Sequence, residues 1–408
     1  MSALALLGGT RTKTKAFPTW PQYDDTEREN LLEVLESRKW WRTEGTKTKQ
    51  FEQDFAAYQQ AAYGIAITNG THALEVALAG IGIRPGDEVI VPNSTFVATA
   101  SSVLFTGALP VLVDVEADSF NLDPDAVEAA ITERTKAIIV VHLGGMAANM
   151  DRLLEITKRH GLKLIEDSAH AHGSEWRGQK IGALGTAGTF SFQSSKTITA
   201  GEGGIIISND ATFERMARSV HDSGRLPGEW FYSHYNSGSN YRLSEWQGAI
   251  LLAQLARLDD QTGRRNRNGL LLDQLLGDID GITPQLRRPE NTRNGHYAYI
   301  FHYDRTKFAN VPTARFIEAI KAEGIPNQAT YPPLHKLDVF QSGAYKQRLS
   351  GDQASATPSF LSQLFPNSEK SYAEAVWIPQ YALLGDEADM HEIASAILKI
   401  QSHARDLC

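Results

Sequence analysis

The segment Thr189-Phe-Ser-Phe-Gln-Ser-Ser-Lys196-Thr-Ile-Thr-Ala-Gly-Glu-Gly-Gly204 places one lysine between two β-type runs. The first run ends in two serines and Lys196, and a glycine-rich turn then leads into Ile205-Ile-Ile207. The roughly ten residues between the runs are too few for the crossover of a parallel pair, so the strands are predicted to be antiparallel. Lys196 then projects from a constrained connection at a strand end.

A lysine held in this way suits Schiff-base chemistry, because burial lowers the pKa of the amine and frees its lone pair for a carbonyl. The alternative is a solvated loop lysine, which is the usual state of this residue type. The neighbours of Lys196 are small and hydroxylic rather than charged. Other chemically suited residues also recur at the ends of other β-type runs, and this favours the reactive role.

The surrounding chain alternates β-type runs with helical patterns. The β-type runs cover residues 64–68, 88–91, 111–115, 137–141, 162–166, 189–192 and 205–208, with helical patterns at 73–79, 95–105, 124–131 and 150–160. This alternation predicts an α/β fold: a mostly parallel seven-stranded sheet with helices on both faces. Ligands of such sheets bind beyond the carboxyl ends of the strands.

The first two strand ends carry residues that suit a phosphorylated, flat ligand. Gly70 and Thr71 follow the first run in a small-residue turn that opens a helix, where backbone N–H groups and the helix dipole attract phosphate. The alternative is an ordinary turn, because Asn-Gly is common in turns. Phe96 follows the second run and could stack on a flat ring or simply pack in the core.

Asp167 ends the fifth run, and a carboxylate at a buried strand end needs a partner. A pyridinium nitrogen supplies one, and the charge keeps such a ring an electron sink. His170 could reach a ring hydroxyl or the substrate. With His172 these residues also suggest a metal site, but no third ligand with recognisable spacing follows, so no metal is predicted. Ser191 and Lys196 complete a set that one cofactor pocket would require.

The rest of the chain predicts a second, smaller domain. Ser244 is a plausible N-cap for a helix that runs to about residue 260. Helices at 313–323 and 387–401 and a short strand at 297–301 follow, which is typical of an α+β domain. We therefore expect a large cofactor-binding domain with an N-terminal arm at 1–265 and a small C-terminal domain at 266–408. Residues 350–367, rich in Ser, Gln and Pro, predict a surface loop.

Composition restricts the function class. The 408 residues carry a formal net charge of -8 and no basic run of five, which argues against a nucleic-acid partner. Cys408 is the only cysteine, so an intrachain disulfide or a cysteine zinc cluster is excluded and a reducing, cytoplasmic setting is expected. The apolar patch at residues 3–7 is too short for a signal sequence, and no apolar run reaches membrane-spanning length.

Ser191-Phe-Gln-Ser-Ser-Lys196 with Gly201-Glu-Gly-Gly204 resembles the cofactor-lysine segment of the DegT/DnrJ/EryC1/StrS family of pyridoxal-phosphate sugar aminotransferases, and the likeness runs through most of the chain. The resemblance implies a PLP-dependent transferase of fold type I with pyridoxal 5'-phosphate as cofactor. It implies the following roles: a Schiff base at Lys196, a pair between Asp167 and the pyridine nitrogen, phosphate binding by Gly70, Thr71 and Ser191, stacking by Phe96, and a contact of His170 with the ring oxygen. Glutamine is common in the family where this chain has His170.

Family members are dimers in which an asparagine of the partner chain reaches the cofactor phosphate. Gly238-Ser-Asn240-Tyr-Arg242 is similar to that segment. The resemblance therefore implies a homodimer with shared active sites, in which Asn240 serves the other chain.

The run Phe17-Pro-Thr-Trp-Pro-Gln-Tyr-Asp-Asp25, with Trp40-Trp41-Arg42, is similar to a subgroup of 3-amino-5-hydroxybenzoate synthases and glutamine-dependent inosose aminotransferases. Tyr331-Pro-Pro-Leu-His335 is more similar to the sugar and cyclitol pattern. The expected activity is amino transfer from glutamate or glutamine to a keto-sugar or ketocyclitol, in amino-sugar, aminocyclitol or antibiotic biosynthesis. Trp41, Tyr331 and His335 are the expected substrate residues, although Trp41 could instead only pack the N-terminal arm.

Two other hypotheses remain at this stage. The first keeps the cofactor but makes the reaction a dehydration and aromatisation, as in hydroxybenzoate synthesis. Lys196 does not separate these two reactions, although it argues against the family's sugar dehydratases, which carry histidine at this position. The second is a non-catalytic regulatory or binding protein on the same scaffold, which the intact Lys196, Asp167, Ser191 and Asn240 disfavour.

Overall fold

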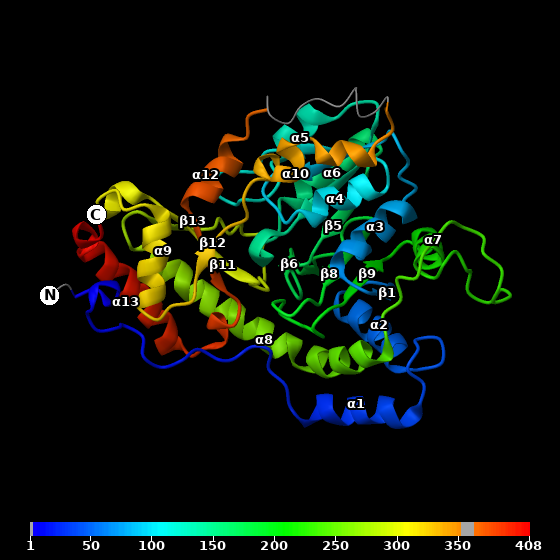
Figure 1. Ribbon diagram of the computed structural model, residues 1–408, viewed down its shortest axis with the longest axis horizontal. Helices are drawn as coiled ribbons and strands as arrows, with labels where there is room; N and C mark the ends of the chain where they lie inside the picture. Colours follow the sequence, from blue (N-terminus) through cyan, green and yellow to red (C-terminus); the bar gives the residue numbers. More distant parts are fainter. Residues whose placement is uncertain (1–2, 352–362) are drawn as a thin grey trace.

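The computed structural model describes residues 3–351 and 363–408. Its largest feature is a seven-stranded sheet in the order β1-β9-β8-β5-β4-β2-β3 (Figure 1). The strands are β1 Tyr63–Ile67, β2 Glu88–Pro92, β3 Leu109–Val113, β4 Thr135–Val141, β5 Lys163–Asp167, β8 Ala187–Ser191 and β9 Gly204–Ser208. A short antiparallel ribbon, β6 Glu175–Trp176 with β7 Gln179–Lys180, lies outside this sheet.

The sheet is parallel from β8 through β3, whereas β9 is antiparallel to both of its neighbours, β1 and β8. Ser191 pairs with Gly204, so the lysine segment is the connection of the β8–β9 pair. Both the mostly parallel seven-stranded sheet and the antiparallel pair around Lys196 are confirmed. The glycine-rich turn closes this connection without a helix, which is why the chain reverses direction there.

Helices cover both faces of the sheet because side chains along a strand point alternately to opposite faces. Ala137 and Ile139 of β4 join the core under α3, α4 and α7, whereas Ile138 and Val140 join the core under α5 and α6. These helices are α3 Gly70–Gly80, α4 Ala98–Phe105, α5 Pro124–Ala130, α6 Met150–His160 and α7 Ala211–His221. A third cluster packs β1, β8 and β9 against α2 Lys47–Tyr58 and α8 Glu245–Gly277.

The helix α8 begins after Ser244, as predicted, but it continues to Gly277 instead of ending near residue 260. The apolar spacing that predicted the end stops near residue 260 because the buried face of the helix becomes polar beyond that point. Arg265 bonds Gln380, and the Asn268 side-chain amide donates to two backbone carbonyls. The helix therefore joins the large sheet to the second core, and the domain boundary at 265/266, which falls within it, stays a prediction.

The C-terminal part forms a four-stranded antiparallel sheet in the order β10-β11-β13-β12. Its elements are β10 Ile282–Pro284, β11 Ala298–Tyr303, α9 Thr313–Ala322, β12 Gln328–Ala329, α10 Asp338–Gln341, α12 Pro366–Glu374, β13 Ala375–Pro379 and α13 Glu387–Ser402. Short 3-10 turns occupy Ala5–Leu7, Leu143–Gly145, Arg305–Phe308, Leu334–Lys336, Ala344–Arg348, Ala382–Leu384 and Ala404–Leu407. The apolar core of the C-terminal part includes Leu272 and Leu276 from the end of α8.

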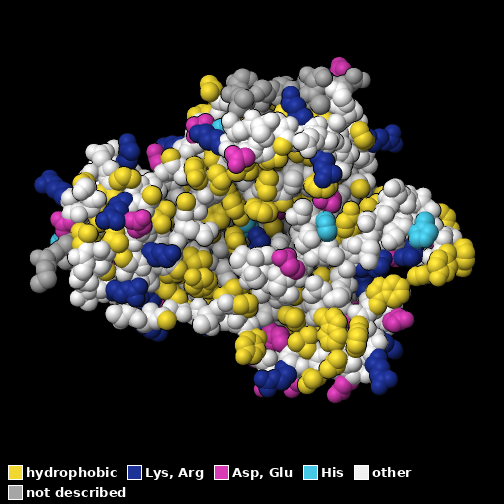
Figure 2. All heavy atoms as spheres, in the orientation of Figure 1, with side chains coloured by type: hydrophobic (Ala, Val, Ile, Leu, Met, Phe, Trp, Pro, Cys, Tyr) yellow, Lys and Arg dark blue, Asp and Glu magenta, His cyan; other side chains and the backbone are white. Residues whose placement is uncertain are grey.

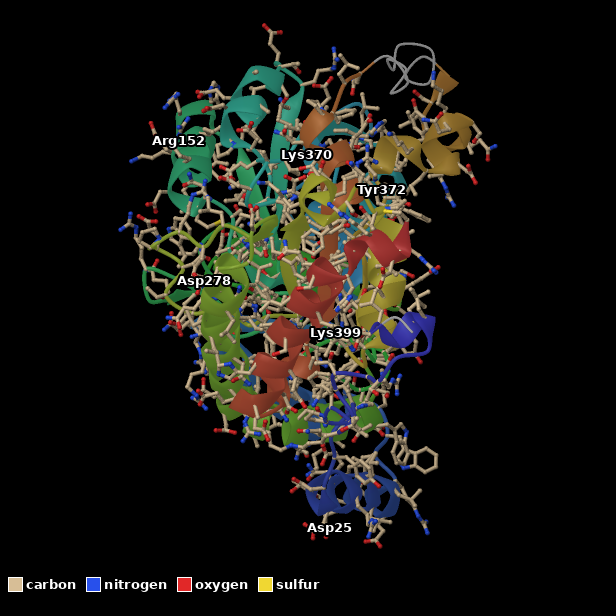
Figure 3. The ribbon with its side chains drawn as sticks, turned by 90° about the vertical axis from the view of Figure 1, so that its left-hand side faces the viewer. Asp25, Arg152, Asp278, Lys370, Tyr372 and Lys399 are labelled. Atoms are coloured by element: carbon tan, nitrogen blue, oxygen red, sulfur yellow. The ribbon has the colours of Figure 1, made fainter. Side chains whose placement is uncertain are left out.

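The N-terminal arm passes along the C-terminal part and leads to α1 Asp25–Ser37, which packs on α8 (Figure 1). In the side view, Lys399 on α13 faces the viewer and Asp25 marks α1 at the bottom (Figure 3). Of the predicted loop at 350–367, residues 352–362 lie outside the described residues, and Pro366 already starts α12. Within the described ranges, no helix is both long and apolar enough to cross a membrane.

Candidate active site

A cavity of about 680 Å³ opens at the carboxyl ends of the parallel strands, where ligands of α/β sheets bind. Residues that follow four strands line it: β1, β2, β5 and β8. Eight residues singled out in the sequence are among its walls: Gly70, Thr71, Phe96, Asp167, His170, Ser191, Lys196 and Tyr331. Trp41, Asn240 and His335 are not among the described residues that line it.

The Lys196 side chain is open to this cavity, and its Nζ lies 4.3 Å from the centroid of the Tyr297 ring. Its backbone N–H donates to the Gln193 carbonyl at 2.9 Å, which fixes the turn. Burial of the amine lowers the pKa of Lys196 to about 8, although the negative charge of Asp167 opposes this shift. About a tenth of the amine is therefore uncharged at pH 7, far more than for an ordinary lysine, and the uncharged form is the one that acts as a nucleophile or a base.

Asp167 is buried at the end of β5. Its Oδ2 accepts a hydrogen bond from Thr99 Oγ1 at 3.0 Å, and its Oδ1 accepts one from the Ala169 N–H at 3.3 Å. Burial raises the pKa of Asp167, while these hydrogen bonds and Lys196 favour the ionised form. A carboxylate of this kind is stabilised by a cationic partner in the cavity.

Thr99 was missed by the sequence analysis. It lies in the first turn of α4, and its hydroxyl also lies 3.0 Å from that of Thr95. The two threonines are four residues apart, but Thr95 precedes the helix, so their hydroxyls meet through the turn that leads into α4. That spacing could have suggested a shared target, but nothing in it identifies Asp167.

His170 lies between the cavity and the C-terminal sheet, stacked on Tyr297 with 4.0 Å between the ring centroids. The Gly144 N–H points at His170 Nδ1, 3.3 Å away, so Nδ1 accepts and the proton belongs on Nε2. Burial and the nearby Lys196 hold the pKa of His170 well below its usual value. The ring is thus a neutral donor through Nε2, which lies 3.4 Å from the Tyr331 hydroxyl.

The N-terminus of α3 forms one end of the cavity. Asn69 caps it by accepting the His72 N–H on Oδ1 at 2.8 Å. A Cβ atom on Gly70 would lie 2.8 Å from the Cβ of Ser191, so only glycine allows the helix end and the serine to meet this closely. Free N–H groups of the first helical turn beside a serine hydroxyl suit a phosphate.

Tyr297 is a second cavity residue that the sequence analysis missed. It precedes β11, and its hydroxyl lies 3.1 Å from Ser195 Oγ, next to the lysine. Together with Tyr331 it brings aromatic surface from the C-terminal part over the cofactor residues. The sequence places Tyr297 at the start of a strand but carries no signal that it meets residues about a hundred positions earlier.

His335, an expected substrate residue, lies outside the cavity. Its Nδ1 lies 2.9 Å from Asn93 Nδ2, its backbone N–H donates to Asn93 Oδ1 at 3.1 Å, and its Nε2 lies 3.2 Å from Glu369. The neighbouring Leu334 N–H donates to the Asn93 carbonyl. These contacts pin the segment to the end of β2, which leaves Tyr331 in the cavity wall and holds the His335 ring away from it.

Trp41 and Asn240 also lie outside the cavity of their own chain. Trp41 contacts Phe231 edge-on, and the guanidinium of Arg242 lies 5.5 Å from a Trp41 ring centroid. Asn240 is exposed, and its Oδ1 accepts the Arg242 N–H at 3.4 Å. Both belong to the surface around residues 225–242, a segment that projects from the large domain (Figure 1).

The residues of the cavity fit pyridoxal 5'-phosphate. A helix N-terminus with Ser191 suits the phosphate, Asp167 suits a protonated ring nitrogen, and the Lys196 amine suits the aldehyde. Phe96 is 54% exposed at the cavity, where a flat ring could cover it. The buried carboxyl group of Asp167 and the uncharged fraction of the Lys196 amine are the two features that a simple structural pocket would not need.

Comparison with known proteins agrees with this chemistry. The model of the DegT/DnrJ/EryC1/StrS aminotransferase family matches residues 21–398. The 3-amino-5-hydroxybenzoate synthase of Amycolatopsis mediterranei (strain S699) is 40% identical, over 94% of this chain and 97% of that protein. The L-glutamine:2-deoxy-scyllo-inosose aminotransferase of Streptomyces paromomycinus is also 40% identical, over 98% of both chains.

Among solved structures, the crystal structure of 3-amino-5-hydroxybenzoic acid synthase matches with a TM-score of 0.86 and 39% identity, over 95% of this chain and 99% of that one. The fold-type-I architecture expected from the resemblance is thereby confirmed. The chain belongs to the DegT/DnrJ/EryC1/StrS aminotransferase family and is a pyridoxal-phosphate-dependent aminotransferase.

Proposed function

We propose that this protein transfers the amino group of L-glutamine, or of L-glutamate, to a ketone carbon of a cyclitol ring in aminocyclitol biosynthesis. The observation that carries the proposal is the 38–40% identity to L-glutamine:2-deoxy-scyllo-inosose aminotransferases over nearly the whole chain. It is combined with a cavity in which Lys196 and Asp167 are both present.

When bound, pyridoxal phosphate supplies a conjugated ring that stabilises negative charge beside the transferred nitrogen. Lys196 would anchor the cofactor and, as a free amine, would move a proton between the cofactor and the reacting carbon of the donor or of the acceptor. Asp167 would hold the positive charge of the ring nitrogen, and His170 would donate from Nε2 to the ring oxygen. Tyr297 and Tyr331 would limit the access of water to Lys196.

A second candidate is a 3-amino-5-hydroxybenzoate synthase-like dehydration. It is favoured by the 40% identity to that synthase and by the TM-score of 0.86 to its crystal structure. The two reactions need the same residues at Lys196 and Asp167, so only the products separate them.

We also propose a homodimer with shared active sites. Two observations support it: Asn240 is exposed outside its own cavity, and the segment before it carries exposed aromatic residues. These are Trp230, Phe231, Tyr232 and Tyr235, with exposed fractions of 42–71% (Figure 2 shows hydrophobic side chains on this projecting part). A second chain would cover this apolar surface and bring Asn240 to the cofactor phosphate.

The deciding experiment is a spectral titration of the cofactor-loaded protein with glutamine and with glutamate, using Lys196→Ala as control. We expect one donor to bleach the visible band of the loaded protein and Lys196→Ala to lack this response. The bleached protein is then given 2-deoxy-scyllo-inosose, and formation of the amine is measured. A band that forms but responds to neither donor contradicts the proposal and favours the dehydration, to be assayed with an aminodehydroshikimate-type compound. Protein that stays colourless with added cofactor favours the binding-protein hypothesis.

A further inference from the structure

A buried imidazole lies beneath the segment that carries Lys196. His172 is 0% exposed, and its two ring nitrogens contact residues on either side of the lysine. Its Nε2 lies 3.0 Å from the carbonyl oxygen of Ser191, where β8 ends, and its Nδ1 lies 3.1 Å from the hydroxyl of Thr197, directly after the lysine. One ring therefore joins the two ends of the turn from which Lys196 projects.

These two contacts fix the tautomer of the ring. A carbonyl oxygen only accepts hydrogen bonds, so the Nε2 of His172 carries the proton and donates to Ser191. Burial and the nearby charge of Lys196 lower the pKa of His172 to about 3, so the ring is neutral and Nδ1 is an acceptor. The Thr197 hydroxyl therefore donates to Nδ1.

Three phenylalanine rings hold the imidazole of His172 in place. The centroids of Phe190, Phe192 and Phe55 lie 5.3, 5.8 and 6.4 Å from its own. All three rings are 0% exposed and belong to the core that packs β8 and β9 against α2 and α8. Because side chains in such cores are closely packed, the histidine ties the lysine turn to a rigid base.

The identity of the residue matters at this position. An apolar ring would fill the space among the phenylalanines equally well, but it would leave the Thr197 hydroxyl without its acceptor. Thr197 is 1% exposed, so water does not readily replace that acceptor. A histidine here serves the polar contacts of the turn and not only the packing of the core.

The same short segment carries the carboxylate on another wall of the cavity. Asp167 ends β5, and a turn in which the Ala171 N–H donates to the Ser168 carbonyl at 2.8 Å then brings His172 to the end of β8. Five positions separate the residue expected at the ring nitrogen from the residue beneath the lysine. The placement of Lys196 relative to Asp167 is thereby set by contacts within the protein.

We propose that His172 is a positioning residue for Lys196: through the Thr197 hydroxyl it holds the turn so that the amine faces the aldehyde of the cofactor. The inference rests on the role proposed for Lys196. In the step that His172 supports, the uncharged Nζ forms a bond to the aldehyde carbon, and the aldehyde oxygen leaves as water with the two protons of the amine. A turn that is held in one arrangement presents Nζ to that carbon more often.

The test compares two probes on cofactor-free protein. Pyridoxal 5'-phosphate reports capture by Lys196, followed by stopped-flow as the visible absorbance rises. Pyridoxamine 5'-phosphate has the same ring and phosphate but an amine in place of the aldehyde, so its affinity, measured by calorimetry, reports the pocket without the lysine reaction. A general change of the pocket affects both probes, whereas a loss of lysine positioning affects only capture.

Thr197→Val keeps the side-chain shape and removes the hydrogen bond to His172. A neutral hydrogen bond of ordinary strength predicts capture that is about three- to tenfold slower, with unchanged affinity for pyridoxamine phosphate. Thr197→Ser keeps a hydroxyl and should restore the rate. The matched control is Thr199→Val in the same connection, where the lost hydroxyl donates to the Phe192 carbonyl at 2.8 Å instead of to His172, and this variant should capture at the unaltered rate.

A second substitution tests whether the effect of Thr197 passes through the imidazole. His172→Gln places an amide N–H near the position of Nε2 and can still donate to Ser191, but it offers Thr197 no acceptor at the position of Nδ1. It should slow capture by the same factor, and Thr197→Val should slow capture no further in the His172→Gln background. Thr197→Val leaves the phenylalanine cluster intact, so it keeps the test valid if His172→Gln fails to fold.

Capture by Thr197→Val at the unaltered rate overturns the inference, as does an equal slowing in Thr199→Val or an equal loss of pyridoxamine phosphate affinity. Fully additive slowing in the double variant also overturns it. Failure of the role proposed for Lys196 has a different signature, because Lys196→Ala would then develop the same visible band as the unaltered protein. No donor or acceptor enters the capture assay, so its outcome is independent of which ketone the protein aminates.

Discussion

Replacing Thr99 by valine tests how Asp167 is prepared for the cofactor. The substitution keeps the side-chain shape but removes the 3.0 Å hydrogen bond that Thr99 donates to Asp167 Oδ2. A hydrogen bond to a charged group contributes about 1.5–3 kcal/mol, and burial already raises the pKa of Asp167. At about 1.4 kcal/mol per tenfold, the variant should bind pyridoxal phosphate roughly ten- to a hundredfold more weakly.

The assay titrates cofactor-free protein with pyridoxal phosphate and follows the visible absorbance at several pH values. The pKa of Asp167 should rise further in Thr99→Val, by about one unit for each 1.36 kcal/mol lost, so cofactor binding should weaken at a higher pH as the solution is acidified. Thr99→Ser keeps a hydroxyl and should restore most of the affinity. Thr106→Val, which removes a hydroxyl at the other end of α4, serves as the matched control.

The reasoning is refuted if Thr99→Val and Thr106→Val both bind the cofactor as tightly as the unaltered protein does and show the same pH dependence. That result would mean that the Ala169 N–H and water support Asp167 sufficiently without the threonine. An equal loss in Thr99→Val and Thr106→Val would point instead to general destabilisation of α4, which thermal unfolding of the two variants would reveal.

Three further predictions use other parts of the structure. Gly70→Ala should lower the free energy of unfolding by about 1–3 kcal/mol and weaken phosphate binding, because the added Cβ would meet Ser191. Gly277 has open space around it, so Gly277→Ala should be as stable as the unaltered protein, and thermal unfolding compares the two variants. The rate at which Lys196 captures pyridoxal phosphate should rise about tenfold per pH unit up to about pH 8 and then level off, and a stopped-flow pH series that shows no plateau contradicts this. Burial lowers the pKa of His172 from 6.5 to about 3, so the unfolded chain takes up a proton more readily than the folded one. The free energy of unfolding should therefore fall by about 1.4 kcal/mol per pH unit below pH 6.5. Chemical denaturation at several pH values should show a smaller fall in His172→Gln.

Local pattern was sufficient for the parts of this fold that depend on nearby residues. The alternation of runs predicted the seven strands, because a buried strand is recognisable within five to seven residues. The short glycine-rich connection around Lys196 predicted the antiparallel β8–β9 pair, because connection length restricts the pairing of adjacent strands. Asp167 and Ser191 were recognisable because each ends a strand, and Gly70 because it begins the helix after the first strand.

Prediction was less complete where a residue's role depends on a distant partner. The end of α8 was misplaced because the helix buries Arg265 and Asn268, whose partners near residues 380–385 make polar residues acceptable on a buried face. His335 was expected to contact the substrate; its contacts with Asn93 and Glu369 place it outside the cavity, and the substrate role stays a prediction. Whether Asn240 reaches the cofactor of a partner chain depends on how two chains associate, so its role stays a prediction.

The amino-acid sequence alone predicted the sheet, the chemistry at Lys196 and the family resemblance, because each follows from residues that are close together along the chain. Only the tertiary structure revealed Thr99 behind Asp167 and Tyr297 beside Lys196. The residues in these hydrogen bonds lie 68 and 102 positions apart in the chain. Hydrogen bonds and charge compensation at such separations depend on folded geometry, which no local pattern of residue types encodes.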